Sequence, residues 1–301
     1  MGKNILVLGG LGFLGRSLVD HYRMKGYSVH VTSKYFDLKP TQKLFTSDYS
    51  KESLLEILNK ERYENIFFLS GNPYPALSVN DCTIDVNQTL IPLINICEAI
   101  KEVRFEGTLW FASSVAVYGE TNLPIQRESD VCRPLSNYAF IKLAGENYLK
   151  MVSRTENMNV GSLRIFSTFG GGLKRQLVYD IFKKIQENDK KISLLGSGLE
   201  VRDLSYVLDQ AKRIKLISDN IIPKGDIVNV GSGEPSTTKQ IAEFMIKIMN
   251  KKTEILFSQK KRSFDGSSWI ASMEKLEKIA NNPKTPLNEA LYKTIRILEK
   301  S

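Results

Sequence analysis

The sequence predicts an α/β protein, with a doubly wound parallel sheet and a smaller α/β lobe toward the C-terminus. Three observations carry this prediction. Short apolar runs alternate with longer helical stretches through residue 165. A glycine-rich turn directly follows the first run, and the regular alternation ends at the glycines of residues 170–172. Such alternation is typical of parallel sheets whose helices pack on both faces.

Six apolar segments in the first half are predicted strands, because continuous apolar runs are typical of strands buried on both faces of a sheet. They are residues 5–8, 29–31, 43–45, 66–69, 109–112 and 160–165. Between them, helical spacing predicts helices at residues 12–25, 51–61, 80–101 and 134–154. The strands and helices therefore follow one another as in a doubly wound sheet.

The second half is less regular, although its elements can still be predicted. The expected helices are residues 176–188, 207–218 and 238–250, the expected strands are 192–194, 227–230 and 254–257, and two helices close the chain. No linker rich in Pro, Gly or Ser separates the halves. We expect a sheet domain at residues 1–170, with 203–232 returning to it, and a lobe made of 171–202 and 233–301.

Composition narrows the class of protein. The 301 residues are 42% hydrophobic and 25% charged, which is typical of a globular chain and excludes collagen-like and disordered classes. The longest apolar stretch, residues 90–100, is shorter than the ~18 residues of a membrane span. Three cysteines without C-x-x-C spacing favour a cytoplasmic location. With two histidines, a His-based metal centre or a Ser-His-Asp triad is not expected.

The net charge of +9 is spread along the chain in short lysine clusters, without a basic arm. We therefore expect neither a nucleic-acid partner nor a membrane partner. A solvated, lysine-rich surface is the plain interpretation. A basic molecule also attracts small polyanionic ligands, which gives the charge a possible role in binding.

Gly9, Gly12 and Gly15 follow the first strand with G-x-x-G-x-x-G spacing and open the first helix. Residues without Cβ let the backbone approach a pyrophosphate, which then faces the helix N-terminus. This pattern predicts a Rossmann-type domain that binds a dinucleotide. Phe13 and Leu14, in the same turn, are expected cofactor contacts, as is Leu69 at the end of the fourth strand.

The second strand usually ends with an acid that binds the ribose of NAD. Here it ends in Ser33-Lys34, and no carboxylate follows until Asp37. A hydroxyl and a cation suit the 2′-phosphate of NADP, so NADP is favoured and NAD remains an alternative, in which Lys34 faces solvent and Asp37 reaches back. Asp48 is placed to reach adenine, or it caps the helix that begins near Lys51.

A second group of residues indicates acid-base chemistry. Tyr138 and Lys142 stand four residues apart on a predicted helix, so they share a face. An ammonium at this position lowers the pKa of the phenol and makes it usable for proton transfer. Ser114 lies at the carboxyl end of a predicted strand, where α/β sheets carry their active sites, and can bind the same substrate oxygen.

Together these motifs make the chain resemble an extended short-chain dehydrogenase/reductase, in the branch that modifies nucleotide-linked sugars. The resemblance covers nearly the whole length and includes residues 113–119, 134–146, 163–166, 196–198, 202–209, 229–234, Arg262 and Asp265. It implies that Ser114, Tyr138 and Lys142 are catalytic and that Tyr138 and Lys142 also contact the cofactor. It implies a nucleoside-diphosphate sugar as substrate and a homodimer formed through helices 80–101 and 134–154.

The same resemblance assigns Arg202 and Arg262 to the substrate diphosphate, which a guanidinium fork suits well. Ser167 takes the place of the usual substrate-facing Asn. Val115 and Ala116 replace the acids that dehydratases and decarboxylases carry after the catalytic Ser/Thr, so dehydration is not expected. Asp85 stands where the family's helix motif has Asn.

The favoured function is oxidoreduction at C4 of a hexose linked to a nucleotide. A 4-ketoreductase would consume NADPH with each turnover, and a 4-epimerase would keep NAD bound and return the hydride to the opposite face. Ser33-Lys34 favours the reductase. A non-catalytic dinucleotide-binding scaffold or sensor is a further alternative of a different class.

Overall fold

The computed structural model describes residues 4–33, 44–260 and 268–300. Within these ranges, seven strands form the main sheet, in the order β10-β6-β5-β4-β1-β2-β3, and all neighbouring pairs are parallel. The strands are β1 (Asn4–Leu8), β2 (Ser28–Ser33), β3 (Leu44–Thr46), β4 (Asn65–Phe68), β5 (Thr108–Ser114), β6 (Val160–Ile165) and β10 (Asp226–Val230). The predicted doubly wound sheet is therefore confirmed.

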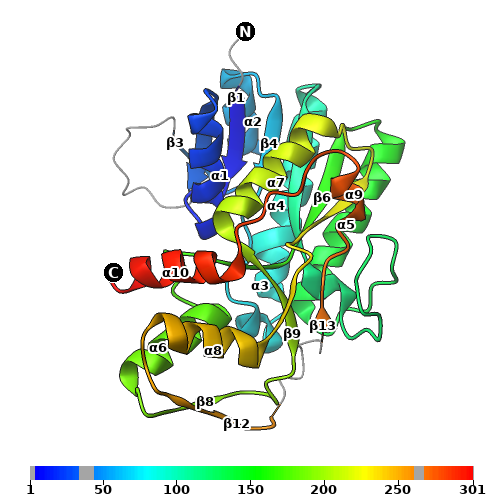
Figure 1. Cartoon of the computed structure of the whole chain (residues 1–301). Helices are drawn as coiled ribbons and strands as arrows, with labels where there is room; N and C mark the ends of the chain where they lie inside the picture. Colours follow the sequence, from blue (N-terminus) through cyan, green and yellow to red (C-terminus); the bar gives the residue numbers. More distant parts are fainter. Residues whose placement is uncertain (1–3, 34–43, 261–267, 301) are drawn as a thin grey trace.

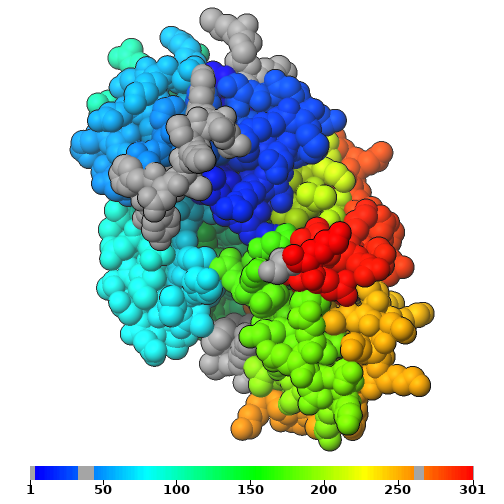
Figure 2. All heavy atoms as spheres, turned by 90° about the vertical axis from the view of Figure 1, so that its left-hand side faces the viewer, coloured from blue at the N-terminus to red at the C-terminus, as the bar shows by residue number. Residues whose placement is uncertain are grey.

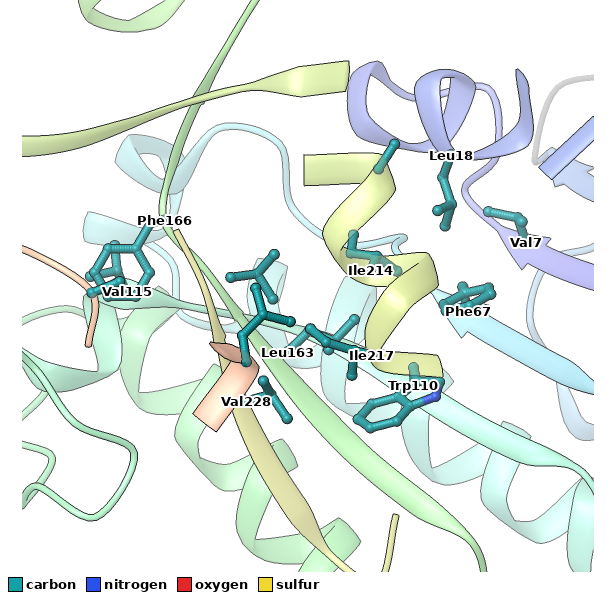
Figure 3. Packing of buried hydrophobic residues seen from close by; sticks show 14 of the residues in the cluster. Val7, Leu18, Phe67, Trp110, Val115, Leu163, Phe166, Ile214, Ile217 and Val228 are labelled. Atoms are coloured by element: carbon teal, nitrogen blue, oxygen red, sulfur yellow. The ribbon is translucent and has the colours of Figure 1, made fainter. Parts of the chain in front are cut away.

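Helices cover both faces of this sheet (Figure 1). They are α1 (Phe13–Met24) and α7 (Val207–Asn220) on one face, and α2 (Lys51–Lys60), α4 (Ile91–Glu102) and α5 (Asn137–Thr155) on the other. Side chains alternate across a strand, so Val7 of β1 packs toward α1 and α7 while Leu6 and Leu8 pack toward the opposite helices. Figure 3 shows Leu18 and Ile214 above the first of these faces.

The C-terminal lobe lies below the main sheet in Figure 1. Its strand β9 (Val201–Tyr206) pairs with β7 (Ser167–Phe169), β11 (Pro235–Thr237) and β13 (Ser268–Trp269), and β8 (Lys191–Leu194) pairs with β12 (Glu254–Phe257). Its helices are α6 (Gln176–Glu187), α8 (Thr238–Ile248) and α10 (Leu287–Leu298), whereas the short α9 (Glu274–Glu277) packs on β10 of the main sheet. A hydrophobic core joins α6, α8 and α10 to these strands.

The single helix expected at residues 80–101 is interrupted. The structure has a short α3 (Thr83–Asp85), a π-helical turn (Val86–Leu90) and then α4. Pro92 stands in the first turn of α4 and has no N–H to donate to the turn before it, so the regular α-helical ladder cannot run through this point. The wider turn places Asp85 and Thr89 in the protein interior.

Two other boundaries differ from expectation. Helix α5 begins at Asn137 because the Ser136 side chain accepts a hydrogen bond from the Ala139 N–H and caps it. The sequence did not predict β7, β11 and β13, which are short, or β9, which carries polar residues within its run. Within the described ranges, every helix is too short or too polar to cross a lipid bilayer.

Candidate active site

A cavity of 840 Å³ lies between the carboxyl edge of the main sheet and the C-terminal lobe. Its walls come from the glycine turn, the ends of β4, β5 and β6, the start of α5 and the residues around α6 and β9. Figure 2 shows the surface hollowed between the residues coloured cyan and those coloured green. The strand order reverses at β1, because β2 and β3 lie on one side of it and β4, β5 and β6 lie on the other. Open α/β sheets bind their ligands at the carboxyl ends of the strands at such a point.

The glycine turn is shaped by close approaches of the backbone. Gly9 has a φ of +86°, which favours glycine, and a Cβ on Gly15 would lie 2.2 Å from the Gly9 carbonyl oxygen. Gly12 caps α1 and brings no side chain to the first N–H groups of the helix. Phe13 and Leu14 line the same cavity, as does Leu69. The turn therefore fits a dinucleotide pyrophosphate.

The residues expected around the adenosine are less fully placed. Strand β2 ends at Ser33, and Lys34 lies outside the described residues. The exposed Asp48 carboxylate accepts hydrogen bonds from the Ser50 N–H at 2.9 Å and from the Ser50 hydroxyl at 2.7 Å. Ser50 itself caps α2, so Asp48 holds the turn before the helix. Neither Ser33 nor Asp48 contributes to the cavity wall.

The three expected catalytic residues meet in the cavity. Ser114 ends β5, and its Oγ accepts a hydrogen bond from the Ala116 N–H at 3.2 Å. The Ser114 side chain lies near enough to Tyr138 to lower the pKa of the phenol. The Lys142 Nζ lies 5.7 Å from the centre of the Tyr138 ring and donates to the Ala112 carbonyl oxygen at 2.7 Å. The structure thus brings together groups from β5 and α5 that the sequence separates.

Burial shifts the pKa values of Tyr138 and Lys142. Burial raises the pKa of Tyr138, so the lowering expected from the Lys142 ammonium is wrong for the folded protein; the Ser114 side chain and the charge of Arg175 act in the opposite direction to burial. Burial lowers the pKa of Lys142 to about 8. At neutral pH, Tyr138 is therefore a neutral phenol and Lys142 is mostly a cation. The site holds a proton that can be donated and a positive charge that can stabilise the phenolate left behind.

Arg175 is a residue of the site that the sequence analysis missed. It precedes α6, lines the cavity and donates from Nη1 to the Pro73 carbonyl oxygen at 2.6 Å. Its guanidinium lies 5.1 Å from the centre of the Tyr74 ring. The signal available in the sequence was a cation soon after the glycines of residues 170–172.

The residues expected to hold the substrate lie on the lobe side. Ser167 and Arg202 line the cavity, and β7 runs parallel to β9 with Ser167 opposite Leu204. The Arg202 guanidinium lies 5.3 Å from the centre of the Trp269 ring, which also faces the cavity. Arg262 lies outside the described residues.

Comparisons with known proteins agree with this geometry. A family model described as the NAD dependent epimerase/dehydratase family matches residues 5–231. A putative UDP-glucose 4-epimerase of Methanocaldococcus jannaschii is 26% identical over 97% of both chains. A dTDP-4-dehydro-6-deoxyglucose reductase of Escherichia coli is 27% identical over 85% of this chain and 84% of its own.

The fold also matches solved structures. The Thermus thermophilus UDP-glucose 4-epimerase, solved in complex with NAD, covers 99% of both chains with a TM-score of 0.88 at 24% identity. This similarity confirms the Rossmann-type architecture over the whole chain. The family match confirms the resemblance seen in the glycine, serine and tyrosine motifs. The chain is therefore an extended short-chain dehydrogenase/reductase enzyme and belongs to the NAD dependent epimerase/dehydratase family.

Proposed function

We propose that the protein is an NADP-dependent 4-ketoreductase that acts on the hexose of a nucleoside-diphosphate sugar. The observation that carries this proposal is the cavity in which Tyr138, Ser114 and Lys142 lie together with the glycine turn and Arg202, and burial there raises the pKa of Tyr138, so the phenol keeps its proton. A ketone reductase must begin its turnover with a proton on its acid, whereas oxidation of a hydroxyl begins with removal of a proton by a base.

The chemistry needs one hydride and one proton. A nicotinamide cofactor held by the glycine turn would supply the hydride for C4. Tyr138 donates its proton to the C4 oxygen, so the C4 carbonyl becomes a hydroxyl and the phenol becomes a phenolate. Ser114 holds the oxygen by a hydrogen bond, and the Lys142 cation stabilises the phenolate until solvent returns the proton.

The neighbours of Ser114 support reduction over elimination of water. Val115 is buried and Ala116 lines the cavity beside it. Neither side chain can accept or donate a proton. A dehydratase needs both an acid and a base in addition to the redox groups, and this position supplies neither.

The end of β2 supports NADP. The strand ends at Ser33, and the sequence continues with Lys34, so the sequence offers a hydroxyl and a cation where NAD enzymes carry an acid. The diphosphate of the sugar is assigned to Arg202 and Arg262. The Escherichia coli relative named as a dTDP-4-dehydro-6-deoxyglucose reductase supports a 6-deoxy-4-keto sugar as the substrate class.

A 4-epimerase is the second candidate, and the same three catalytic residues support it. It would first oxidise C4 and then return the hydride to the opposite face, so the sugar must turn within the site. The relative from Methanocaldococcus jannaschii named as a putative 4-epimerase favours this alternative.

One experiment separates the candidates. The purified protein is incubated with NADPH or NADH and a panel of nucleotide-linked 4-keto-6-deoxyhexoses, and the loss of nicotinamide absorbance is followed. A reductase consumes NADPH in proportion to the product formed. In parallel, nucleotide-linked hexoses are incubated without added NADPH and analysed for C4 epimers. Epimer formation without net nicotinamide oxidation would replace the reductase by the epimerase, and inactivity in both assays would contradict both candidates.

A further inference from the structure

A buried carboxylate, Asp85, acts electrostatically on Tyr138 and Lys142 and has no role in the steps above. Asp85 of α3 has no exposed surface, and the Asn72 side chain donates to its Oδ1 at 2.9 Å. The other carboxylate oxygen, Oδ2, is also buried and has no hydrogen-bond partner among the residues that the structure describes. A buried charge without a bonded partner is costly, so its presence at this position calls for a compensating interaction.

The π-helical turn and Gly71 connect the region of Asp85 with Lys142. The π-helical turn that follows Asp85 packs against α5 and buries the Thr89 hydroxyl, which also has no partner within the described chain. Gly71 lies between this turn and α5, with a φ of +155°. A Cβ there would be 3.0 Å from the Thr89 Oγ1 and 3.5 Å from the Lys142 Nζ. Because Gly71 has no side chain, the Thr89 hydroxyl and the Lys142 ammonium border the same small space.

Charged residues from three parts of the chain act on Tyr138 and Lys142. Asp85 from α3 raises the pKa of both Tyr138 and Lys142. On α5, Glu146 also raises the pKa of Lys142, and Arg175 before α6 lowers the pKa of Tyr138. Glu146 is already committed to a buried ion pair with Arg164, at 2.8 Å between Oε2 and Nη2. Asp85 is thus the acid whose charge is left to act on the pair.

We propose that Asp85 is a positioning residue whose buried carboxylate serves as the counter-charge of Lys142 and keeps the Tyr138–Lys142 pair protonated through neutral pH. This inference rests on the proposed function insofar as a protonated Tyr138 is what a ketone reductase requires. An amide at this position would retain the shape and the bond to Asn72 and would lose the charge. The carboxylate therefore extends the pH range over which Tyr138 can donate.

Asp85→Asn tests the proposal, because its Oδ1 can still accept the hydrogen bond from Asn72. Asp81→Asn is the matched control: Asp81 is an exposed acid of the same segment, and its carboxylate bonds only locally to Thr83 in the described chain. Asp85→Ser is a second neutral variant that cannot overfill the site. A purely structural role would lower thermal stability in the Asp85 variants and leave the titration of Lys142 unchanged.

The first readout is NMR of the protein labelled with ¹³C at lysine Cε, without any substrate. The lysine that titrates near pH 8 is assigned to Lys142 by its loss in Lys142→Met. Removing the negative charge disfavours the ammonium, so the midpoint should move to lower pH in Asp85→Asn and Asp85→Ser and stay in place in Asp81→Asn. An unchanged midpoint in both Asp85 variants would overturn the proposal.

The second readout is turnover on the substrate found in the panel above. The ratio of turnover at pH 9 to turnover at pH 7 should fall about threefold or more in Asp85→Asn relative to the Asp81→Asn control. An unchanged ratio would overturn the proposed role in proton donation. A shifted Lys142 midpoint in a protein that reduces no 4-keto sugar would overturn the proposed function alone, because the NMR titration needs no substrate.

Discussion

Gly15→Ala is expected to disrupt the cofactor site, because the surrounding backbone atoms cannot rotate aside for the added Cβ. The added Cβ would lie 2.2 Å from the Gly9 carbonyl oxygen and 2.9 Å from the Gly10 Cα, and both contacts are backbone atoms that cannot rotate away. The turn must therefore move away from the first N–H groups of α1. Losing one hydrogen bond to a charged phosphate costs about 1.5–3 kcal/mol, which corresponds to a roughly 10- to 150-fold rise in the Kd for the dinucleotide.

Isothermal titration with NADPH and with NADH measures this loss. Gly26→Ala is the control, because Gly26 also has a positive φ, +82°, and has no atom within 4 Å of its added Cβ. It lies just after α1, away from the cavity, so it should lower thermal stability through backbone strain without changing the Kd. If Gly15→Ala bound the dinucleotide as tightly as Gly26→Ala, the assignment of the turn as a pyrophosphate site would be wrong.

Three further predictions follow from the site and the surface. Lys34→Ala should weaken NADPH about tenfold or more and leave NADH nearly unchanged in a titration, and equal losses for both would contradict NADP preference. Reductase turnover should fall as the pH rises through about 8, because Lys142 then loses its charge, and a flat rate from pH 7 to 9 would contradict this. Ile91 on α4 and Phe140 on α5 are 43% and 60% exposed, and we predict that such apolar positions form a dimer interface. Light scattering that gave only a 34.1 kDa species at micromolar concentration would contradict a stable dimer.

The sequence predicted those parts of the site that depend on local patterns. The glycine turn, the end of β5 and the Tyr138–Lys142 spacing each lie within one segment, where apolar runs and helical spacing report the backbone directly. Not every apolar position of the helix expected to form the dimer is free to do so, since Cys97 lies in the core between the sheet and its helices.

Long-range contacts account for what could not be predicted. Strand β9 reads as polar because it contains Arg202 and Asp203, yet Asp203 is buried and accepts backbone hydrogen bonds from Ser232 and Gly233. Arg175 is held at the site by its hydrogen bond to the carbonyl oxygen of Pro73, which lies 102 residues earlier in the chain. No local periodicity reports contacts of this kind.

Asp85 shows the same limit. Its departure from the family's Asn was visible in the sequence, but its meaning depended on a helix that Pro92 interrupts. Only the folded chain shows that Asp85 is buried at the end of α3, acts electrostatically on Lys142 and has one oxygen without a bonded partner among the described residues. The sequence thus revealed that a charged residue replaces a neutral one, but it did not reveal which residues surround Asp85.

In the proposed reaction, Tyr138 carries the proton to the C4 oxygen. Tyr138→Phe removes the hydroxyl and keeps the ring, so NADPH binding measured by titration should change little. General acid catalysis contributes about 10²- to 10⁴-fold, so turnover on the substrate identified in the panel should fall by at least about a hundredfold. Turnover above a tenth of the wild-type rate in Tyr138→Phe, with the cofactor bound normally, would contradict the claim.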